Sequence, residues 1–100
     1  MQGAIVIFRL PPKTKQSVAN VFCQRFYGQD ASSHGGKYRY HRRGILDDIP
    51  YRKLIRGVIL IEPRDLDTVL TFLDRYGAEV YVRSIRLVAE DLQIIGLSQK

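Results

Sequence analysis

The chain has 100 residues, of which 45% are hydrophobic, and a formal net charge of +6. This length suits one ordinary domain, and the apolar content is enough for a modest core. The longest apolar stretches, residues 3–8 and 57–61, are far shorter than the roughly 20 residues of a membrane span. The N-terminus has no signal-peptide pattern. We therefore expect a single cytoplasmic domain over residues 1–100.

The positive charge is concentrated in one part of the sequence. Between Lys37 and Arg56, seven basic residues stand against two acidic ones. From Glu62 to Glu79, acidic residues outnumber basic ones. An uneven distribution of this kind indicates an anionic partner for the basic segment.

The N-terminal residues predict a strand followed by an amphipathic helix. Residues 4–10 form a β-branched and aromatic run that a proline pair ends, as in a strand buried on both faces. Apolar residues at spacings of three and four then predict a helix over residues 14–27, with Gly28 as its C-terminal cap. They are Val18, Val21, Phe22 and Phe26.

Cys23, the only cysteine, lies within this helical pattern. We expect it to be a buried small hydrophobe rather than a catalytic thiol. Residues 29–36 are small and polar, contain two glycines and show no periodicity, so they predict a mobile loop.

The middle of the chain combines a basic strand with an irregular segment. Residues 37–43 alternate aromatic and cationic side chains, which predicts a strand. Residues 44–56 contain Asp47, Asp48 and Pro50, and we expect an irregular basic excursion there. Residues 57–61 are fully apolar and predict a second buried strand, which a proline closes.

The C-terminal part predicts a helix, a strand and a short helical tail. The apolar positions between residues 65 and 76 fit an amphipathic helix, residues 79–88 alternate as a strand, and residues 90–97 form the tail. The complete order predicts an α+β fold, the ferredoxin-like βαββαβ plait, with four antiparallel strands and two helices on one face. In that plait, the strand at 37–43 lies at an edge of the sheet.

The ferredoxin-like fold carries many functions, so function must come from particular residues. The RNA-recognition motif of aromatic and glycine residues is absent from the third strand at 57–61. No zinc-ligand spacing, nucleophile elbow or phosphate-binding glycine loop is present either. We therefore expect no metal and no cofactor.

The basic, tyrosine-bearing strand is the main candidate for a nucleic-acid-binding site. Cations about 7 Å apart along one face of a strand match successive phosphates, and tyrosine rings offer surfaces on which bases stack. The candidate residues are Lys37, Tyr38, Arg39, Tyr40, His41, Arg42 and Arg43, followed by Arg52, Lys53 and Arg56. The alternative is that these cations protect an edge strand from aggregation. The second basic cluster favours binding, because edge protection does not explain it.

Two sets of residues suggest catalysis more weakly. His34 and His41 flank a glycine-containing loop and would suit a metal-free ribonuclease, although histidines beside a binding surface are more often phosphate contacts. Asp47 and Asp48 would suit a Mg²⁺-dependent nuclease, but adjacent side chains in an extended segment point apart, which favours a turn role. We therefore expect no catalytic residues.

The apolar tail suggests that the sheet face without helices is covered, either by the tail or by a second copy of the chain in a homodimer. The sequence thus favours a small, non-enzymatic nucleic-acid-binding protein, with RNA ahead of DNA because tyrosine and arginine suit unstacked bases. An oligomeric regulatory subunit that docks an acidic protein partner is the alternative, and a small nuclease is the third possibility. No membrane partner is expected.

Overall fold

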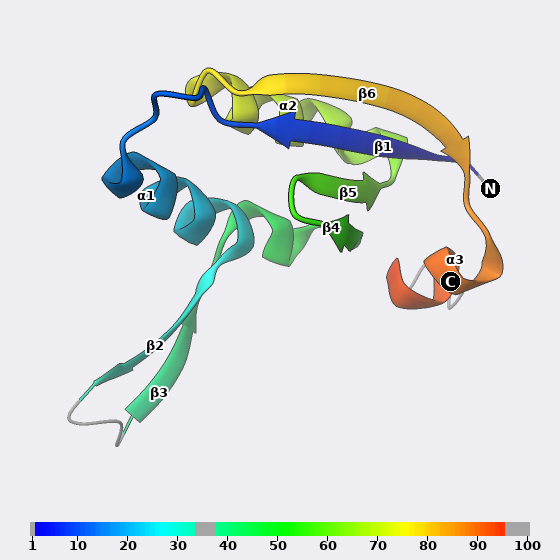
Figure 1. The fold of residues 1–100 in the computed structure, drawn as a ribbon. Coiled ribbons are helices and arrows are strands. Elements are labelled where there is room, and N and C mark those ends of the chain that lie inside the picture. Colours follow the sequence, from blue (N-terminus) through cyan, green and yellow to red (C-terminus); the bar gives the residue numbers. More distant parts are fainter. Residues whose placement is uncertain (1, 34–37, 96–100) are drawn as a thin grey trace. The chain divides into compact units, whose positions relative to one another are not determined.

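The structure is a computed structural model that describes residues 2–33 and 38–95. The chain divides into two compact units. The first, here called the sheet unit, comprises residues 1–12 and 49–100, and the second, the ribbon unit, comprises residues 13–48. Figure 1 shows a four-stranded sheet in the sheet unit and a helix followed by a two-stranded ribbon in the ribbon unit.

The sheet unit is built on four antiparallel strands in the order β4-β5-β1-β6. Their bounds are β1 Gln2–Arg9, β4 Tyr51–Ile55, β5 Val58–Ile61 and β6 Glu79–Arg86. The central strand β1 pairs with β5 on one side and with β6 on the other. The prediction that β1 is buried on both faces was wrong, because Val6 is fully buried whereas its neighbour Ile7 is 40% exposed.

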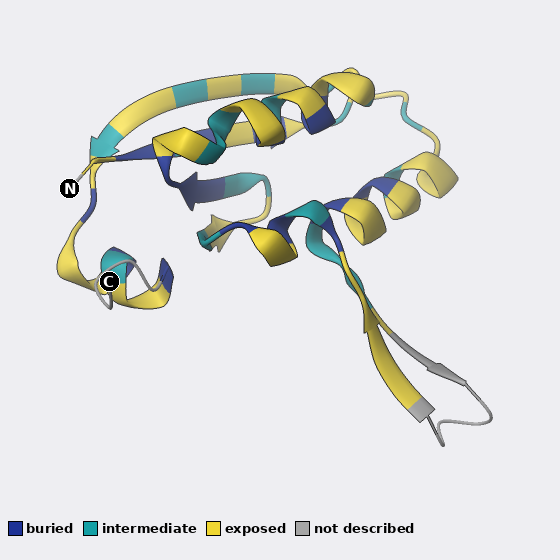
Figure 2. Cartoon of the chain, turned by 180° about the vertical axis from the view of Figure 1, so that it is seen from behind, coloured by how far each residue is buried: buried dark blue, intermediate teal, exposed yellow. Residues whose placement is uncertain are grey.

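Helix α2, Leu66–Arg75, covers one face of this sheet (Figure 2). A short 3-10 turn, η2 Pro63–Asp65, leads from β5 into the helix. The predicted amphipathic pattern is confirmed, since the apolar side chains of α2 are buried together with the strand residues of this face. The buried set comprises Ala4, Val6, Phe8, Ile59, Ile61, Val69, Phe72 and Leu73.

Helix α3, Ala89–Ile95, packs on the other face near one end of the sheet. Ile95 and Leu87 form a buried cluster with Leu60 of β5, and three half-buried residues complete it, namely Ile5, Ile85 and Leu92. The helical tail expected over residues 90–97 therefore exists, with 96 and 97 outside the described residues, and it covers part of the sheet face that α2 leaves open.

Three hydrogen bonds hold α3 in this position. Asp91 Oδ2 accepts a hydrogen bond of 3.1 Å from the backbone N–H of Val88, which caps the start of the helix. Asp91 Oδ1 also accepts one of 2.5 Å from Arg52 on β4, and the same arginine donates to Glu90 Oε1 at 3.0 Å. Arg52 thus fastens the C-terminal helix to the edge of the sheet.

The ribbon unit contains α1 Gln16–Tyr27, β2 Gln29–Ser33, β3 Tyr38–Arg42 and the 3-10 turn η1 Ile45–Asp48. Gly28 caps α1 as predicted, and its N–H donates to Gln24 O. Residues 29–33, expected within a mobile loop, instead form β2 because β3 supplies a pairing partner. Residues 34–36 of that loop lie outside the description. Cys23 is exposed, which overturns the expectation of a buried thiol, since it lies outside the stripe formed by Phe22 and Phe26.

The basic strand does not occupy the position predicted from the sequence. Among the described residues, β3 pairs with β2 in a two-stranded ribbon and is not part of the four-stranded sheet, whose two edge strands are β4 and β6. β4 lies within residues 44–56, the segment expected to be irregular. The turn residues Asp47, Asp48 and Pro50 interrupt only its first part, and Tyr51–Ile55 then extends along β5. The described residues nevertheless form an α+β fold with a four-stranded antiparallel sheet and three α-helices, which is compatible with a ferredoxin-like arrangement.

Candidate nucleic-acid interface

The ribbon presents different side chains on its two faces. The register places Arg42 opposite Gln29, His41 opposite Asp30 and Arg39 opposite Ser32. Because side chains alternate along a strand, Tyr40 and Arg42 share one face, and Arg39 and His41 share the other. The alternation predicted for this strand is present over Tyr38–Arg42.

Tyr40 and Arg42 form an exposed aromatic and cationic pair. The guanidinium carbon of Arg42 lies 5.8 Å from the centre of the Tyr40 ring, within the range of a cation–π contact. Arg42 Nη2 also approaches the Tyr40 hydroxyl at 3.4 Å. Tyr40 remains 45% exposed, so part of the ring is accessible to a ligand.

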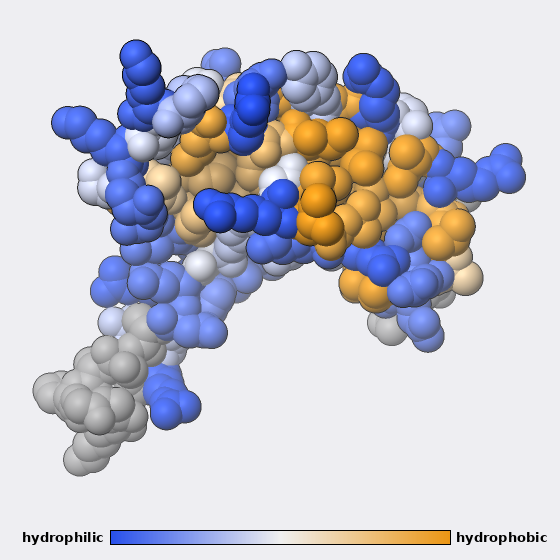
Figure 3. Space-filling view, viewed as in Figure 1, coloured by the Kyte–Doolittle hydropathy of each residue, from blue (hydrophilic) through white to orange (hydrophobic). Residues whose placement is uncertain are grey.

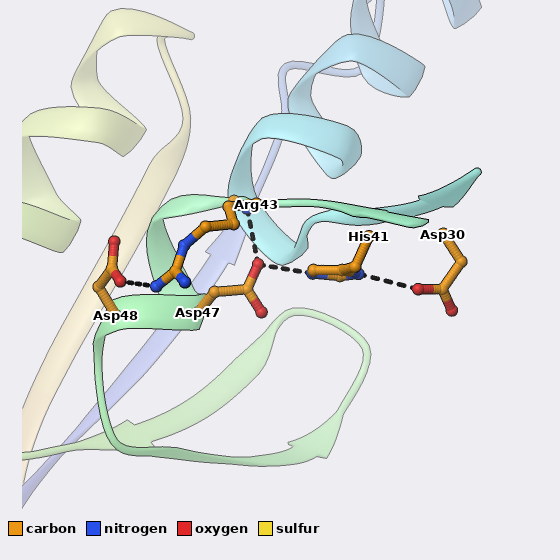
Figure 4. Close-up of polar contacts among 6 residues, drawn as sticks. Asp30, His41, Arg43, Asp47 and Asp48 are labelled. Carbon is orange, nitrogen blue, oxygen red and sulfur yellow. Dashed lines mark hydrogen bonds and ion pairs between the residues drawn. The ribbon is translucent and has the colours of Figure 1, made fainter. Parts of the chain in front are cut away.

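His41 lies between two carboxylates (Figure 4). Its Nδ1 is 2.8 Å from Asp30 Oδ1 on the neighbouring strand, and its Nε2 is 2.8 Å from Asp47 Oδ2 on η1. Asp47 Oδ2 also accepts a hydrogen bond of 2.7 Å from the backbone N–H of Gly44. The imidazole therefore links both strands of the ribbon to the turn that follows them.

This geometry favours the positively charged form of His41. Each ring nitrogen lies 2.8 Å from a carboxylate oxygen, and because an ionised carboxylate only accepts hydrogen bonds, the doubly protonated ring can donate to both. The hydrogen bonds to Asp47 and then to Asp30 raise the pKa of His41 above its ordinary value. The N–H of Gly44 and then His41 lower the pKa of Asp47.

The side chains of Asp47 and Asp48 bind different cations. Asp47 contacts His41, whereas Asp48 forms an ion pair with Arg43, as Figure 4 shows. Among residues 2–33 and 38–95, no group of three histidine, cysteine or acidic side chains is arranged to hold a metal ion. Both nitrogens of His41 are engaged, so this conformation offers no free imidazole lone pair to a substrate.

Two glycines allow the strands to approach at the base of the ribbon. A Cβ atom on Gly44 would lie 2.6 Å from the carbonyl oxygen of Phe26 and closer still to the amide nitrogen of Gly28. Gly28 itself has a φ of 88°, a conformation that glycine adopts without strain. These two residues allow the chain segments on either side of the ribbon to approach closely at its open end.

The sequence did not identify Asp30 as part of this cluster. Asp30 precedes His41 by eleven residues, and nothing in the local pattern marks it. Its role depends on the register between β2 and β3, and β2 itself was expected to be a loop. The only available signal was its charge, opposite to that of the neighbouring basic segment.

The second basic cluster belongs to the sheet unit and has a different character. The side chain of Arg52 is only 22% exposed and is engaged by Glu90 and Asp91. Lys53 and Arg56 are exposed. Of the other candidates, His34 and Lys37 lie outside the described residues, and Tyr38 is described only by its backbone in β3.

No helix in the part of the chain that the structure describes is both long and apolar enough to cross a membrane. Comparison of the chain with protein-family models, curated proteins and solved structures found no match.

Proposed function

We propose that the protein binds nucleic acid through the β2–β3 ribbon, with RNA ahead of DNA as the ligand. The observation that carries the proposal is the joint exposure of Arg39, Tyr40 and Arg42 on β3. Among the described residues, neither Arg39 nor Arg42 forms an ion pair, and Arg42 contacts the ring and the hydroxyl of Tyr40. These cations therefore remain available to phosphates.

The chemistry of the pair suits an unpaired base with its phosphate. A guanidinium donates several N–H groups to phosphate oxygens, and a tyrosine ring offers a surface for stacking. Arg42 already lies over the Tyr40 ring, so part of the orientation needed for binding is present before the ligand arrives. Unpaired bases can reach such a surface more readily than bases within a duplex, which favours RNA loops and single strands.

The ion-paired cations are assigned a supporting role. Arg43 forms an ion pair with Asp48, and His41 forms ion pairs with Asp30 and Asp47. Each of these two cations therefore stabilises the ribbon unit and offers less net charge to a ligand. Arg52 forms ion pairs with Glu90 and Asp91 of α3. The proposal therefore rests chiefly on Arg39, Tyr40 and Arg42.

We infer in addition that the complete chain follows the ferredoxin-like plait. The order β1, α1, β4, β5, α2, β6 supports this, and so does the sheet order β4-β5-β1-β6, in which the first and third strands of the plait are central and the second and fourth form the edges. On this interpretation the β2–β3 ribbon is an insertion between the first helix and the second strand of the plait. Insertions of this kind commonly carry binding residues.

The test is the replacement of Arg39, Arg42 and Arg43 by alanine. We expect weaker binding to RNA, and a flatter dependence of affinity on salt by about two units of slope, because the phosphate contacts of Arg39 and Arg42 are lost and the ion-paired Arg43 contributes less. Binding is measured with labelled single-stranded RNA, single-stranded DNA and duplex DNA at several salt concentrations.

The matched control replaces Lys13, Lys15 and Arg25, which are exposed residues of the same unit. It removes the same charge without touching the ribbon. Equal losses from the two triple variants would mean that net charge alone governs binding and would overturn the proposed site. Retention of an acidic protein, with no retention of any nucleic acid, would favour the alternative regulatory function.

A further inference from the structure

The sheet unit has a long, uncovered strand edge. β6 contains eight residues and lies at the end of the sheet order, with β1 on its inner side. Among residues 2–33 and 38–95, no strand pairs with its outer side. An edge of this kind is a template for pairing with another chain unless charges or bulges prevent it.

The hydrogen-bond pattern shows which main-chain groups point outward. The N–H of Phe8 donates to Gly57 O at 2.8 Å, so the amide of Phe8 points toward β5. Amide direction alternates along a strand, so the main-chain groups of Ile7 and Arg9 point the other way, toward β6. The residues of β6 opposite them are Tyr81 and Glu79, whose main-chain groups therefore point toward β1. The main-chain groups of Val80 and Val82 consequently point away from the sheet.

A contact of Arg83 agrees with this assignment. Its Nη1 donates a hydrogen bond of 2.7 Å to the carbonyl oxygen of Val82. A guanidinium from the next residue thus occupies an acceptor that a neighbouring strand would otherwise use. The contact is exposed, and a partner strand can replace it at little cost.

We propose that β6 is a homodimer interface, in which two copies of the chain pair their β6 strands antiparallel with Tyr81 at the two-fold axis. In this register Val80 of each copy exchanges main-chain hydrogen bonds with Val82 of the other. Glu79, which pairs with Arg9 of its own copy at 2.7 Å, lies opposite Arg83 of the other, so opposite charges meet at two symmetric positions. Tyr81 of one copy lies opposite Tyr81 of the other, on the sheet face that carries Ile7.

A second copy fits this edge better than it fits the opposite one. β4 is shorter, carries Arg52 and Lys53 without an acidic residue, and has a register shift between Lys53 and Ile55. Like charges and irregular pairing both discourage association of β4 with itself. On β6 the acidic and basic residues are placed so that the strand is complementary to itself.

The edge adjoins an apolar row on the face not covered by α2. The ladder places Tyr81, Ile7, Val58 and Ile55 side by side across all four strands. Tyr81, Ile7 and Ile55 are exposed, and Figure 3 shows apolar residues gathered on this side of the sheet. Pairing at β6 places the two Tyr81 rings together and joins the rows of the two copies.

The proposal is tested with two charge reversals on the full chain after removal of nucleic acid. Glu79→Arg and Arg83→Glu each place like charges opposite one another twice, so each should weaken the dimer by about tenfold in Kd. An equal mixture of the two variants restores opposite charges at both positions and should recover the dimer as a heterodimer. Sedimentation equilibrium measures both effects, and recovery in the mixture also shows that both variants fold.

The matched controls reverse neighbouring charges on α2, with Asp74→Arg for the first variant and Arg75→Glu for the second. Both residues are exposed and belong to α2 rather than to the β6 edge, so association should be unchanged. A wild-type protein that stays monomeric at its highest soluble concentration would overturn the proposal. A dimer that neither reversal weakens would overturn it equally, because another surface would then hold the copies together.

The register is tested by cysteine cross-linking in a Cys23→Ser background, because Cys23 is exposed. At the proposed axis, the two Cα atoms of position 81 are about 4.5 Å apart, which a disulfide can span. The two Cα atoms of position 83 are about 14 Å apart, which a disulfide cannot span. Tyr81→Cys should therefore form covalent dimers on oxidation and Arg83→Cys should not, and the reverse result would exclude this register.

Discussion

At the residue scale, His41 is better explained as a structural cation than as a catalytic base. The two aspartates that flank it come from β2 and η1, so its charge holds together three segments of the ribbon unit. The sequence allowed a role as a phosphate contact or as a general base. Both roles need a free ring nitrogen, and in this geometry each nitrogen already donates to a carboxylate.

This arrangement predicts how the ribbon responds to pH. A histidine whose pKa is raised on folding stabilises the fold fully below its unfolded value of about 6.5, and that contribution is lost as pH rises through the folded pKa. Because the pKa of His41 is raised in the folded protein, the ribbon should loosen as the pH rises above the pKa of the unfolded residue and through the folded pKa. Hydrogen exchange of the β2 and β3 amides at several pH values measures the loosening.

Asp30→Asn removes one of the two carboxylates and should lower the pKa of His41. NMR titration of the ring protons measures this change. Asp74→Asn, on α2, serves as the control and should leave the titration unchanged. A pKa of His41 at or below the ordinary value in the wild-type protein would contradict the bridged arrangement.

At the scale of elements, the C-terminal helix depends on Arg52. α3 has only seven residues, too few for an isolated helix to be stable, so its order depends on packing and on the ion pairs to Glu90 and Asp91. Asp91 is 8% exposed and would lose its charged partner if Arg52 were removed. The cation that the sequence assigned to ligand binding therefore stabilises the fold.

Arg52→Ala should lower the free energy of unfolding by about 1–3 kcal/mol, because it leaves a buried carboxylate with one hydrogen bond. Arg43→Ala is the control, since its pair with Asp48 is exposed on both sides and should contribute less than about 1 kcal/mol. Urea denaturation measures both variants. Equal effects of the two variants would show that Arg52 does not fasten the helix.

Truncation after Val88 is a related test of the same packing. It should expose the apolar residues that α3 covers, among them Leu60 and Ile5, and lead to aggregation or altered association. A truncated chain as stable and as soluble as the full one would show that the tail contributes nothing to the core.

At the scale of the whole molecule, we predict binding without cleavage. A general acid or base contributes about 10²–10⁴-fold to rate, so a nuclease that used His41 or Asp47 would lose activity when either is substituted. Labelled RNA and DNA are incubated with the wild-type protein, with Mg²⁺ or with a chelator, and both the bound fraction and the product length are followed. Turnover that disappears in His41→Ala or Asp47→Asn would refute this prediction and support a nuclease.

The local elements could be predicted well because their signals lie within a few neighbouring residues. Apolar spacing placed α1 and α2 within a few residues of their bounds, and Gly28 was identified as the cap of α1. The alternation in β3 was also predicted. These features depend on side-chain periodicity and backbone preference, which the sequence displays directly.

What the sequence determined by itself was therefore an α+β fold with its main helices and strands and a concentrated basic segment. Only the tertiary structure decided that β3 pairs with β2, that β4 rather than β3 is an edge strand of the four-stranded sheet and that Asp30 and Asp47 enclose His41. The physical reason is that strand pairing and ion pairing join segments that are separate in the sequence. Periodicity shows which face of a strand is apolar, but the partner and its register depend on where the rest of the chain lies.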